Sequence, residues 1–226
     1  MLSINTIVVP QGAEYQAVCR GLSKSGVDSI KVIAIPIGVK HTTQVLLNYS
    51  EEINRSANVL IMGLCGSLSN CHTVKDYVLV KSCQDINHNL IDLDAELTTN
   101  IQRKLSTSLK SSVDLVIALT SDRIINQARE KFILAQQYSA TIVEMEGYSY
   151  VKELQRQGIA VAMLRVVSDD LRGDIPDLNQ VIDSQGNIKS LPMAISLIKQ
   201  PITAIRLIRG SLTGLKALET ITAKLF

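Results

Sequence analysis

The chain has 226 residues, of which 46% are hydrophobic, and this is enough to build the core of one α/β domain. Its formal net charge is only +2, and aromatic residues make up 4% of it with no tryptophan, so we expect no nucleic-acid partner. No apolar run approaches the ~20 residues of a membrane-spanning helix, and the N-terminus lacks a secretion-signal pattern. We therefore expect a cytoplasmic protein.

Apolar runs of strand length alternate with runs of helical character along most of the chain. The predicted strands are 4–9, 29–35, 59–64, 77–83, 113–119, 141–143 and 159–167. The predicted helices are 14–22, 42–53, 95–109, 127–138 and 148–157. This alternation predicts a single α/β domain, with a central mixed, mostly parallel, twisted sheet flanked by helices. We place this domain at residues 1–175 and treat residues 176–226 as a C-terminal helical extension.

The last 26 residues, 201–226, carry apolar side chains at helical spacing and an excess of positive charge. Four basic residues stand against one acidic residue, Glu219: Arg206, Arg209, Lys216 and Lys224. Such a tail can dock on its own domain, which is the commoner outcome, or lie on an anionic membrane surface. Gly210 and Gly214 weaken the helix in either case.

The cysteines and histidines do not indicate a metal site or a nucleophile. The four cysteines form no CxxC pair, and the three histidines are not at metal-ligand spacing. Cys71 and His72 are adjacent, but a Cys/His nucleophile needs a third, orienting group that the sequence does not reveal. We interpret the thiols as buried or incidental ones in a reducing compartment, and we expect neither metal nor cofactor.

Acidic residues follow two predicted strands that one helix connects. Glu144 and Glu146 follow strand 141–143, and Asp169 follows strand 159–167. In parallel sheets ligands bind at the carboxyl ends of strands. If the backbone stays extended, Glu144 and Glu146 share one face and repel each other unless a ligand donates hydrogen bonds or carries positive charge between them. A ribose diol or an oxocarbenium-like sugar fits this requirement; the alternative is a pair of solvated glutamates at a strand end.

Two more features lie at strand ends. The small residues Gly63, Cys65 and Gly66 predict a turn after strand 59–64, where the backbone comes close to a ligand. Glu14 begins a helix just after the first strand. A carboxylate there is stabilised by the helix dipole, and it is also where a catalytic acid or base would be displayed.

Four segments together resemble the nucleoside phosphorylase/nucleosidase superfamily. They are Val-Glu-Met-Glu-Gly at 143–147, Arg-Val-Val-Ser-Asp at 165–169, the small-residue segment 63–67 with Val-Lys-Asp at 74–76, and Glu14. The resemblance covers residues 4–170 and is closest to the hydrolytic branch, the methylthioadenosine/S-adenosylhomocysteine nucleosidases. Segment 119–123 and the tail also resemble hopanoid-associated members, which are linked to the cleavage of adenine from adenosylhopane.

The resemblance implies a role for each matching residue. Asp169, helped by Ser168, would protonate purine N7 as the base leaves, and Glu14 would orient or deprotonate the attacking water. Glu146 would hold the ribose hydroxyls, with Met145 under the sugar. Glu144 and the segment containing Gly63, Cys65 and Gly66 would complete the substrate site. The resemblance also implies a homo-oligomer.

One departure favours water over phosphate as the nucleophile. The positions at which phosphorylases of this superfamily hold phosphate correspond to Ile61 and Leu64, which offer no charge and no side-chain hydrogen bond. Arg20 or Arg123 could substitute from elsewhere. We expect hydrolysis of an adenosine derivative of the methylthioadenosine, S-adenosylhomocysteine or adenosylhopane type. The alternatives are a phosphate-dependent purine nucleoside phosphorylase and a non-catalytic nucleoside-binding protein.

Overall fold

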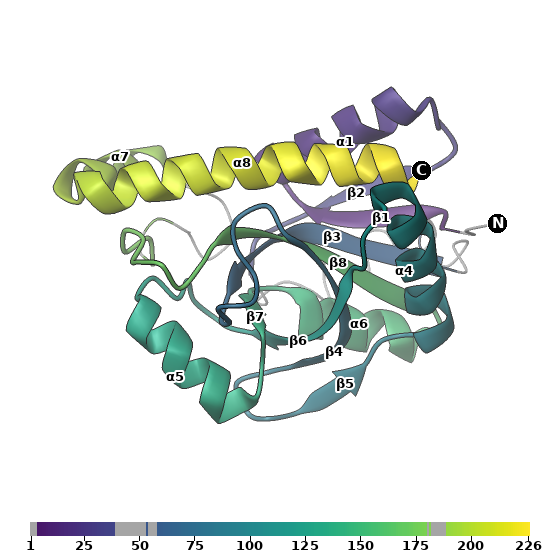
Figure 1. Cartoon of the computed structure of the whole chain (residues 1–226), viewed down its shortest axis with the longest axis horizontal. Helices are drawn as coiled ribbons and strands as arrows, with labels where there is room; N and C mark the ends of the chain where they lie inside the picture. The colour runs from purple at the N-terminus through teal and green to yellow at the C-terminus, as the bar shows by residue number, and fades with distance from the viewer. Residues whose placement is uncertain (1–3, 39–52, 54–57, 180, 182–188) are drawn as a thin grey trace.

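A computed structural model describes residues 4–38, 53, 58–179, 181 and 189–226 (Figure 1). Its strands are β1 (Thr6–Pro10), β2 (Lys31–Ile35), β3 (Asn58–Ser67), β4 (Tyr77–Gln84), β5 (Leu90–Asp92), β6 (Asp114–Thr120), β7 (Ile142–Glu144) and β8 (Ala160–Asp169). Its helices are α1 (Ala13–Ser25), α4 (Ala95–Leu109), α5 (Ala128–Tyr138), α6 (Gly147–Arg156), α7 (Ser190–Lys199) and α8 (Pro201–Leu225). The predicted helix 42–53 lies almost wholly outside the described residues.

Strand β3 organises the sheet, because it has different neighbours along its two halves. One edge pairs with β1 near its start and with β7 near its end, while the other edge pairs with β8 along its whole length. From β8 the sheet continues through β4 and β6 back to β7, so these five strands close into a ring, and β1, β2 and β5 extend from it (Figure 1). Parallel and antiparallel pairs are both present, and the parallel ones predominate. The predicted α/β fold with a mixed, mostly parallel sheet is confirmed.

The predicted turn at 63–67 is wrong, because β3 continues through Ser67. Its small residues are required by close packing against neighbouring side chains instead. A side chain at Gly63 would collide with the Arg165 guanidinium, and one at Gly66 would come within 3.0 Å of an Asp169 carboxylate oxygen. Gly66 is in register with Val143 of β7 on one side and Asp169 of β8 on the other. This one position of β3 therefore brings the two acidic strand ends together.

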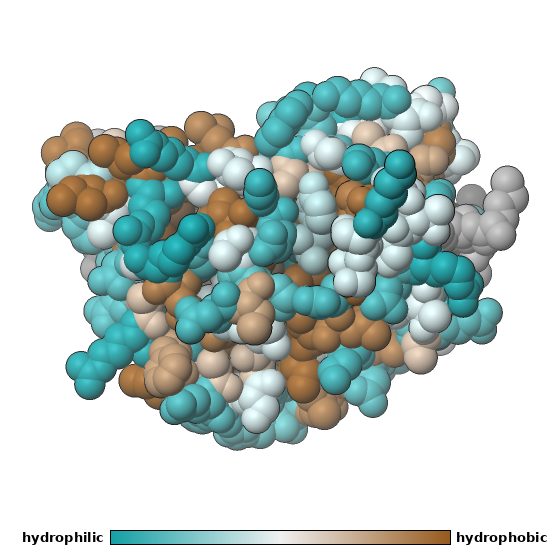
Figure 2. All heavy atoms as spheres, viewed as in Figure 1, coloured by the Kyte–Doolittle hydropathy of each residue, from teal (hydrophilic) through white to brown (hydrophobic). Residues whose placement is uncertain are grey.

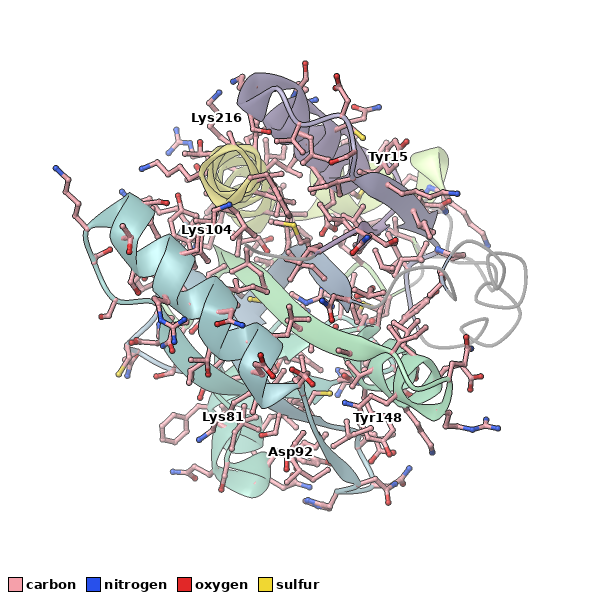
Figure 3. The ribbon with its side chains drawn as sticks, turned by 90° about the vertical axis from the view of Figure 1, so that its right-hand side faces the viewer. Tyr15, Lys81, Asp92, Lys104, Tyr148 and Lys216 are labelled. Atoms are coloured by element: carbon pink, nitrogen blue, oxygen red, sulfur yellow. The ribbon has the colours of Figure 1, made fainter. Side chains whose placement is uncertain are left out.

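Helix α8 brings the C-terminal part of the described chain against its N-terminal part. It packs against α1 and β8 and is seen end-on between α1 and α4 in Figure 3. Its inward side chains are fully or almost fully buried: Ala204, Ala217, Leu218, Ile221 and Leu225. Glu219 of α8 accepts hydrogen bonds from Lys24, Arg20 and Lys216, and these lower its pKa to about 2.

Strand β5 has no counterpart among the predicted strands, and α7 lies within the predicted helical extension 176–226 without having been predicted as a separate helix. Strand β5 pairs with β4 at the edge of the sheet. Helix α7 precedes α8 and packs against it, with Gln200 between the two. None of the helices in the described part of the chain is long and apolar enough to cross a membrane.

Candidate active site

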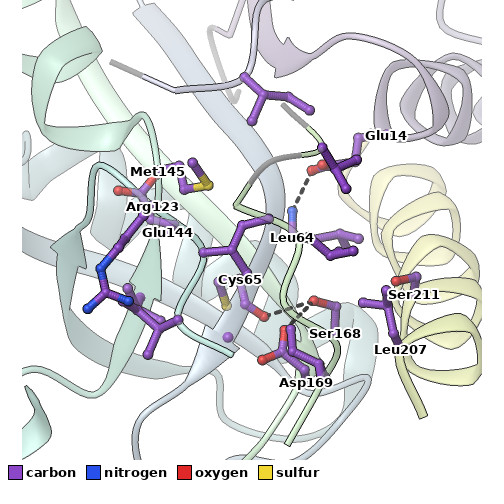
Figure 4. A pocket seen from close by; sticks show the side chains of 18 of the residues that line it. Glu14, Leu64, Cys65, Arg123, Glu144, Met145, Ser168, Asp169, Leu207 and Ser211 are labelled. Carbon is purple, nitrogen blue, oxygen red and sulfur yellow. Dashed lines mark hydrogen bonds between the residues drawn. The ribbon is translucent and has the colours of Figure 1, made fainter. Parts of the chain in front are cut away.

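A cavity of about 280 Å³ lies where β3, β7 and β8 meet (Figure 4). Eight of the nine predicted site residues line it: Glu14, Cys65, Gly66, Glu144, Met145, Glu146, Ser168 and Asp169. The ninth, Gly63, lies in β3 against Arg165 and Glu14 rather than in the cavity wall. The rest of the lining is largely apolar: Ile124, Ile125, Ile175, Leu178, Val181, Met193 of α7 and Leu207 of α8. A mostly apolar cavity with a few convergent polar groups is the usual form of a small-molecule site.

Arg165 lies fully buried behind this cavity and is surrounded by carboxylates. Its guanidinium pairs with Glu144, and one nitrogen lies 3.6 Å from a Glu146 oxygen. Glu144 also accepts hydrogen bonds from Thr120 Oγ1 and from the backbone N–H groups of Glu146 (3.1 Å) and Gly147 (2.7 Å). With so many donors already bound, the Glu144 carboxylate holds Arg165 in place and has little capacity left for a ligand.

Glu146 is not extended as the alternation argument assumed, and that assumption is wrong. Strand β7 ends at Glu144, and Glu146 precedes the first turn of α6 with φ −131° and ψ −30°. Its carboxylate accepts a hydrogen bond from the backbone N–H of Gly38 at 3.2 Å. Burial and the neighbouring charge of Glu144 raise the pKa of Glu146 to about 8, although Arg165 opposes the shift. Glu146 is therefore a cavity carboxyl with lone pairs still open to a ligand.

Glu14 and Arg165 approach the same point of β3. Glu14, in the first turn of α1, accepts a hydrogen bond from the backbone N–H of Leu64 at 2.6 Å, and burial raises the pKa of its carboxyl. Nε and Nη1 of Arg165 are buried and have no hydrogen-bond partner among the residues described. A side chain at Gly63 would meet both Nη1 of Arg165 and a carboxylate oxygen of Glu14. A buried, unpaired N–H group is costly, so this place favours a small polar ligand atom.

Asp169 is held by a residue that the sequence did not indicate, Lys131 of α5. The Lys131 side chain is 1% exposed, and its ammonium group pairs with Asp169. The hydroxyl of Ser168 lies 3.0 Å from Asp169 Oδ1 and 3.2 Å from the carbonyl oxygen of Cys65 (Figure 4). The one available signal is spacing, because Lys131 lies seven residues before the buried Tyr138 and so on the inward face of α5.

Asp170, next to Asp169, turns away from the cavity. It is buried and bonded to Arg172, with Nε to Oδ2 at 2.8 Å. Burial alone would raise the pKa of Asp170, but the hydrogen bonds from Arg172 outweigh it and lower that pKa. The two adjacent aspartates thus have separate cationic partners.

The thiols do not supply a nucleophile in this cavity. Burial raises the pKa of the Cys65 thiol well above its usual range, which keeps it protonated and unreactive. Cys71 is exposed, and the adjacent His72 lies 3.9 Å from Asp114 at a different surface groove. In the described ranges, no group of three or more His, Cys, Asp or Glu side chains is placed to hold a metal ion.

Comparison with known protein families shows to which family the chain belongs. A sequence model of the phosphorylase superfamily matches residues 42–191, which is more than half of the chain. The chain belongs to the phosphorylase superfamily. No curated protein matches its sequence.

Solved structures of the superfamily show the same fold at low sequence identity. The Helicobacter pylori methylthioadenosine nucleosidase mutant with 5′-methylthioadenosine in its active site is 17% identical, covers 98% of each chain and has a TM-score of 0.68. Futalosine hydrolase of Helicobacter pylori is 16% identical, covers 94% of this chain and 98% of its own, and has a TM-score of 0.64. The Campylobacter jejuni methylthioadenosine/S-adenosylhomocysteine nucleosidase is 14% identical, covers 96% and 99%, and has a TM-score of 0.60.

This superfamily member offers little to a phosphate ion. Ile61 is fully buried in β3, and Leu64 presents an apolar side chain to the cavity. Arg20 bonds Glu219 at 2.9 Å and does not reach the site. Arg123 does line the cavity, but its guanidinium is bonded to Glu130 of α5.

Proposed function

We propose that this chain is a purine nucleosidase that hydrolyses the N-glycosidic bond of an adenosine derivative and releases the base. The substrate is of the methylthioadenosine, S-adenosylhomocysteine or adenosylhopane type. The observation that carries the proposal is the arrangement of one cavity, which is lined by Glu14 of α1, Glu146 just before α6 and Asp169 of β8. The nucleosidases that share the fold support it as well.

On the base side, Asp169 supplies the proton. When the C1′–N9 bond breaks, its electron pair moves into the purine, and N7 must gain a proton for the base to leave easily. The ammonium group of Lys131 would give a proton to the Asp169 carboxylate as this carboxyl group protonates N7, which leaves Lys131 neutral and Asp169 ionised. Ser168 orients Asp169 through its hydroxyl group. Lys131 and Asp169 would thus act together as the acid.

On the sugar side, Glu146 and Glu14 have separate roles. Glu146 accepts hydrogen bonds from the ribose hydroxyls, and its negative charge stabilises the oxocarbenium-like sugar when it is ionised. The attacking water would bind between Glu14 and the unpaired N–H groups of Arg165, on the side of the sugar away from the base. Its oxygen bonds to C1′, and Glu14 takes the proton that it loses. A raised pKa suits Glu14 to accept a proton near neutral pH.

One observation favours a second candidate, a phosphate-dependent phosphorylase. Arg123 is the arginine that lines the cavity, and its side chain is 47% exposed, so it could turn from Glu130 toward an anion. The apolar side chain of Leu64 and the buried position of Ile61 count against this candidate. A strict phosphate requirement for base release would decide in its favour.

The experiment is base release from adenosine, methylthioadenosine, S-adenosylhomocysteine, adenosylhopane and inosine by the purified chain, with and without phosphate. We expect adenine to appear without phosphate, and Asp169→Asn to lower kcat by ~10²–10⁴-fold, the usual contribution of a general acid. Asp122→Asn, which changes an exposed aspartate near the site, is the matched control. Full activity of Asp169→Asn would overturn the mechanism. Tight nucleoside binding without turnover would identify a binding protein instead.

A further inference from the structure

The outer side of α7 and α8 carries large apolar side chains that nothing in the described structure covers. Six of them form what we call the apolar face: Ile195, Ile198, Ile202, Ile205, Ile208 and Leu212. Ile198 and Ile202, on either side of the turn between the helices, are 79% and 80% exposed. In Figure 2 hydrophobic residues gather over this end of the molecule, with hydrophilic side chains between them.

The position of these residues follows from the helical repeat. Ile205 and Leu212 lie seven residues apart, directly opposite the buried Gly210 and Gly214 that face β8. Ile202 and Ile208 flank them. The α7–α8 turn also extends past the sheet in Figure 1. The apolar face is therefore the side of this helix pair that points away from the domain.

Positive charge surrounds the apolar face. Lys199, Arg206, Arg209 and Lys216 are all exposed, and the sequence contains no acidic residue from 184 to 218. Lys75 and Tyr77 lie beside Leu212 and Lys216 across a shallow groove. They add one more cation and one aromatic side chain to this surface. Two acids lie close to these cations, and both are paired: Glu219 with Lys216, and Asp170 with Arg172.

We propose that the apolar face docks on an anionic lipid bilayer, with its isoleucines at the boundary of the acyl chains and its cations among the headgroups. An exposed apolar stripe with basic flanks is the pattern of helices that lie in a membrane interface. A second copy of this chain fits less well, because a two-fold contact through this face would bring the same four cations onto one another. The helices lie on the bilayer and do not cross it.

Docking would place the active site next to the membrane. The inner side of the same helix pair contributes Met193 and Leu207 to the cavity wall, while the outer side would contact lipid. The proposal about the surface stands apart from the proposed activity, because it is tested by binding alone.

The test is co-sedimentation of the full-length chain with vesicles of phosphatidylcholine, with or without phosphatidylglycerol. The wild type should bind the anionic vesicles. Ile198→Ser with Ile202→Ser should lower the partition coefficient about tenfold or more, because two isoleucines no longer leave water. Arg206→Gln with Arg209→Gln should lower it roughly fivefold for each charge on anionic vesicles only.

Helix α5 offers matched controls, since Ile133 is 51% exposed and Arg129 is exposed, both outside the apolar face. Ile133→Ser and Arg129→Gln should bind as the wild type does, and all variants should keep the wild-type melting temperature.

Absence of binding to anionic vesicles would overturn the proposal, as would equal binding by the Ile198/Ile202 variant. So would a wild-type dimer that this variant dissociates without any vesicle binding, since the face would then be an interface between copies.

Discussion

At the scale of single residues, the buried pair of Lys131 and Asp169 is the feature that most affects the chemistry. A buried lysine is rare unless it is paired, and its removal leaves an uncompensated carboxylate. Asp169 lies at the end of β8, where the cavity begins, so its partner from α5 helps to set its position and its readiness to give a proton. Lys131 touches Asp169 and not the cavity, which makes it a positioning and proton-supplying residue.

We predict that Lys131→Met lowers base release at neutral pH by at least tenfold and changes the pH profile of kcat/KM. Without the ammonium group, the pair has one proton fewer to give to purine N7, so base release should slow and its dependence on pH should change. Lys131→Arg, which keeps the charge, should restore part of the activity. The measurement is kcat/KM from about pH 5 to about pH 9 for the wild type and both variants.

Lys81→Met is the control for this prediction, because Lys81 is exposed on β4, away from the site (Figure 3). Thermal unfolding of each variant separates a loss of fold from a loss of proton supply. A Lys131→Met protein with a wild-type pH profile would show that Lys131 has only a structural role.

At the scale of elements, two glycines let α8 lie directly on the end of β8. A side chain at Gly210 would collide with the backbone carbonyl oxygen of Ser168, and one at Gly214 would come within 3.4 Å of the Ser168 Cα atom. From the sequence alone, these glycines only weaken a helix. In the structure they allow the close approach that fixes Ser168, and through it Asp169, at the cavity.

Gly210→Ala should therefore destabilise the protein, although alanine is the better helix former by ~1 kcal/mol. Overpacking against a backbone atom costs about 1–3 kcal/mol, and α8 must move away from Ser168 to relieve it. We expect a lower free energy of unfolding in urea together with slower base release. Arg209→Ala, at the exposed neighbouring position, should leave both unchanged. Stability equal to or above that of the wild type would contradict this account of the contact.

At the scale of the whole molecule, local patterns predicted most of the fold and part of the site. Apolar runs located β1, β3, β6 and β8 to within a few residues, because a strand buried on both faces must be continuously apolar. The acidic strand ends were predicted for the same reason, since carboxylates cannot continue such a run. What the sequence did not predict depends on contacts between distant segments. Lys131 is paired across 38 positions of the chain, and Arg165 is buried among three glutamates, Glu14, Glu144 and Glu146, that are distant from it in the sequence.

The continuation of β3 through 63–67 has the same origin. Glycines and a cysteine after an apolar run are typical of a turn, and only the neighbouring Arg165 and Asp169 side chains explain why they occur inside a strand. The boundary between the domain at 1–175 and the extension at 176–226 remains a prediction. Because α8 packs against α1 and β8, deletion of the extension tests the stability of the domain as well.

Deletion of residues 201–226 should unfold the protein rather than release a tail. Leu218, Ile221 and Leu225 of α8 are all 0% exposed, and each buried side chain of this size contributes ~1.5–3 kcal/mol. Together these three contributions are comparable to the total free energy of unfolding of a typical domain, ~5–15 kcal/mol. The deletion would also expose the face of α1 that packs against α8. We expect the shortened chain to be insoluble or to lack a cooperative thermal transition by circular dichroism, whereas Ile198→Ser with Ile202→Ser melts as the wild type does. A truncated protein with a wild-type melting curve would show that α8 is dispensable, and membrane binding could then be tested by deletion. Otherwise the two functions of α8, packing on its inner side and docking on its outer side, can be separated only by exposed point substitutions.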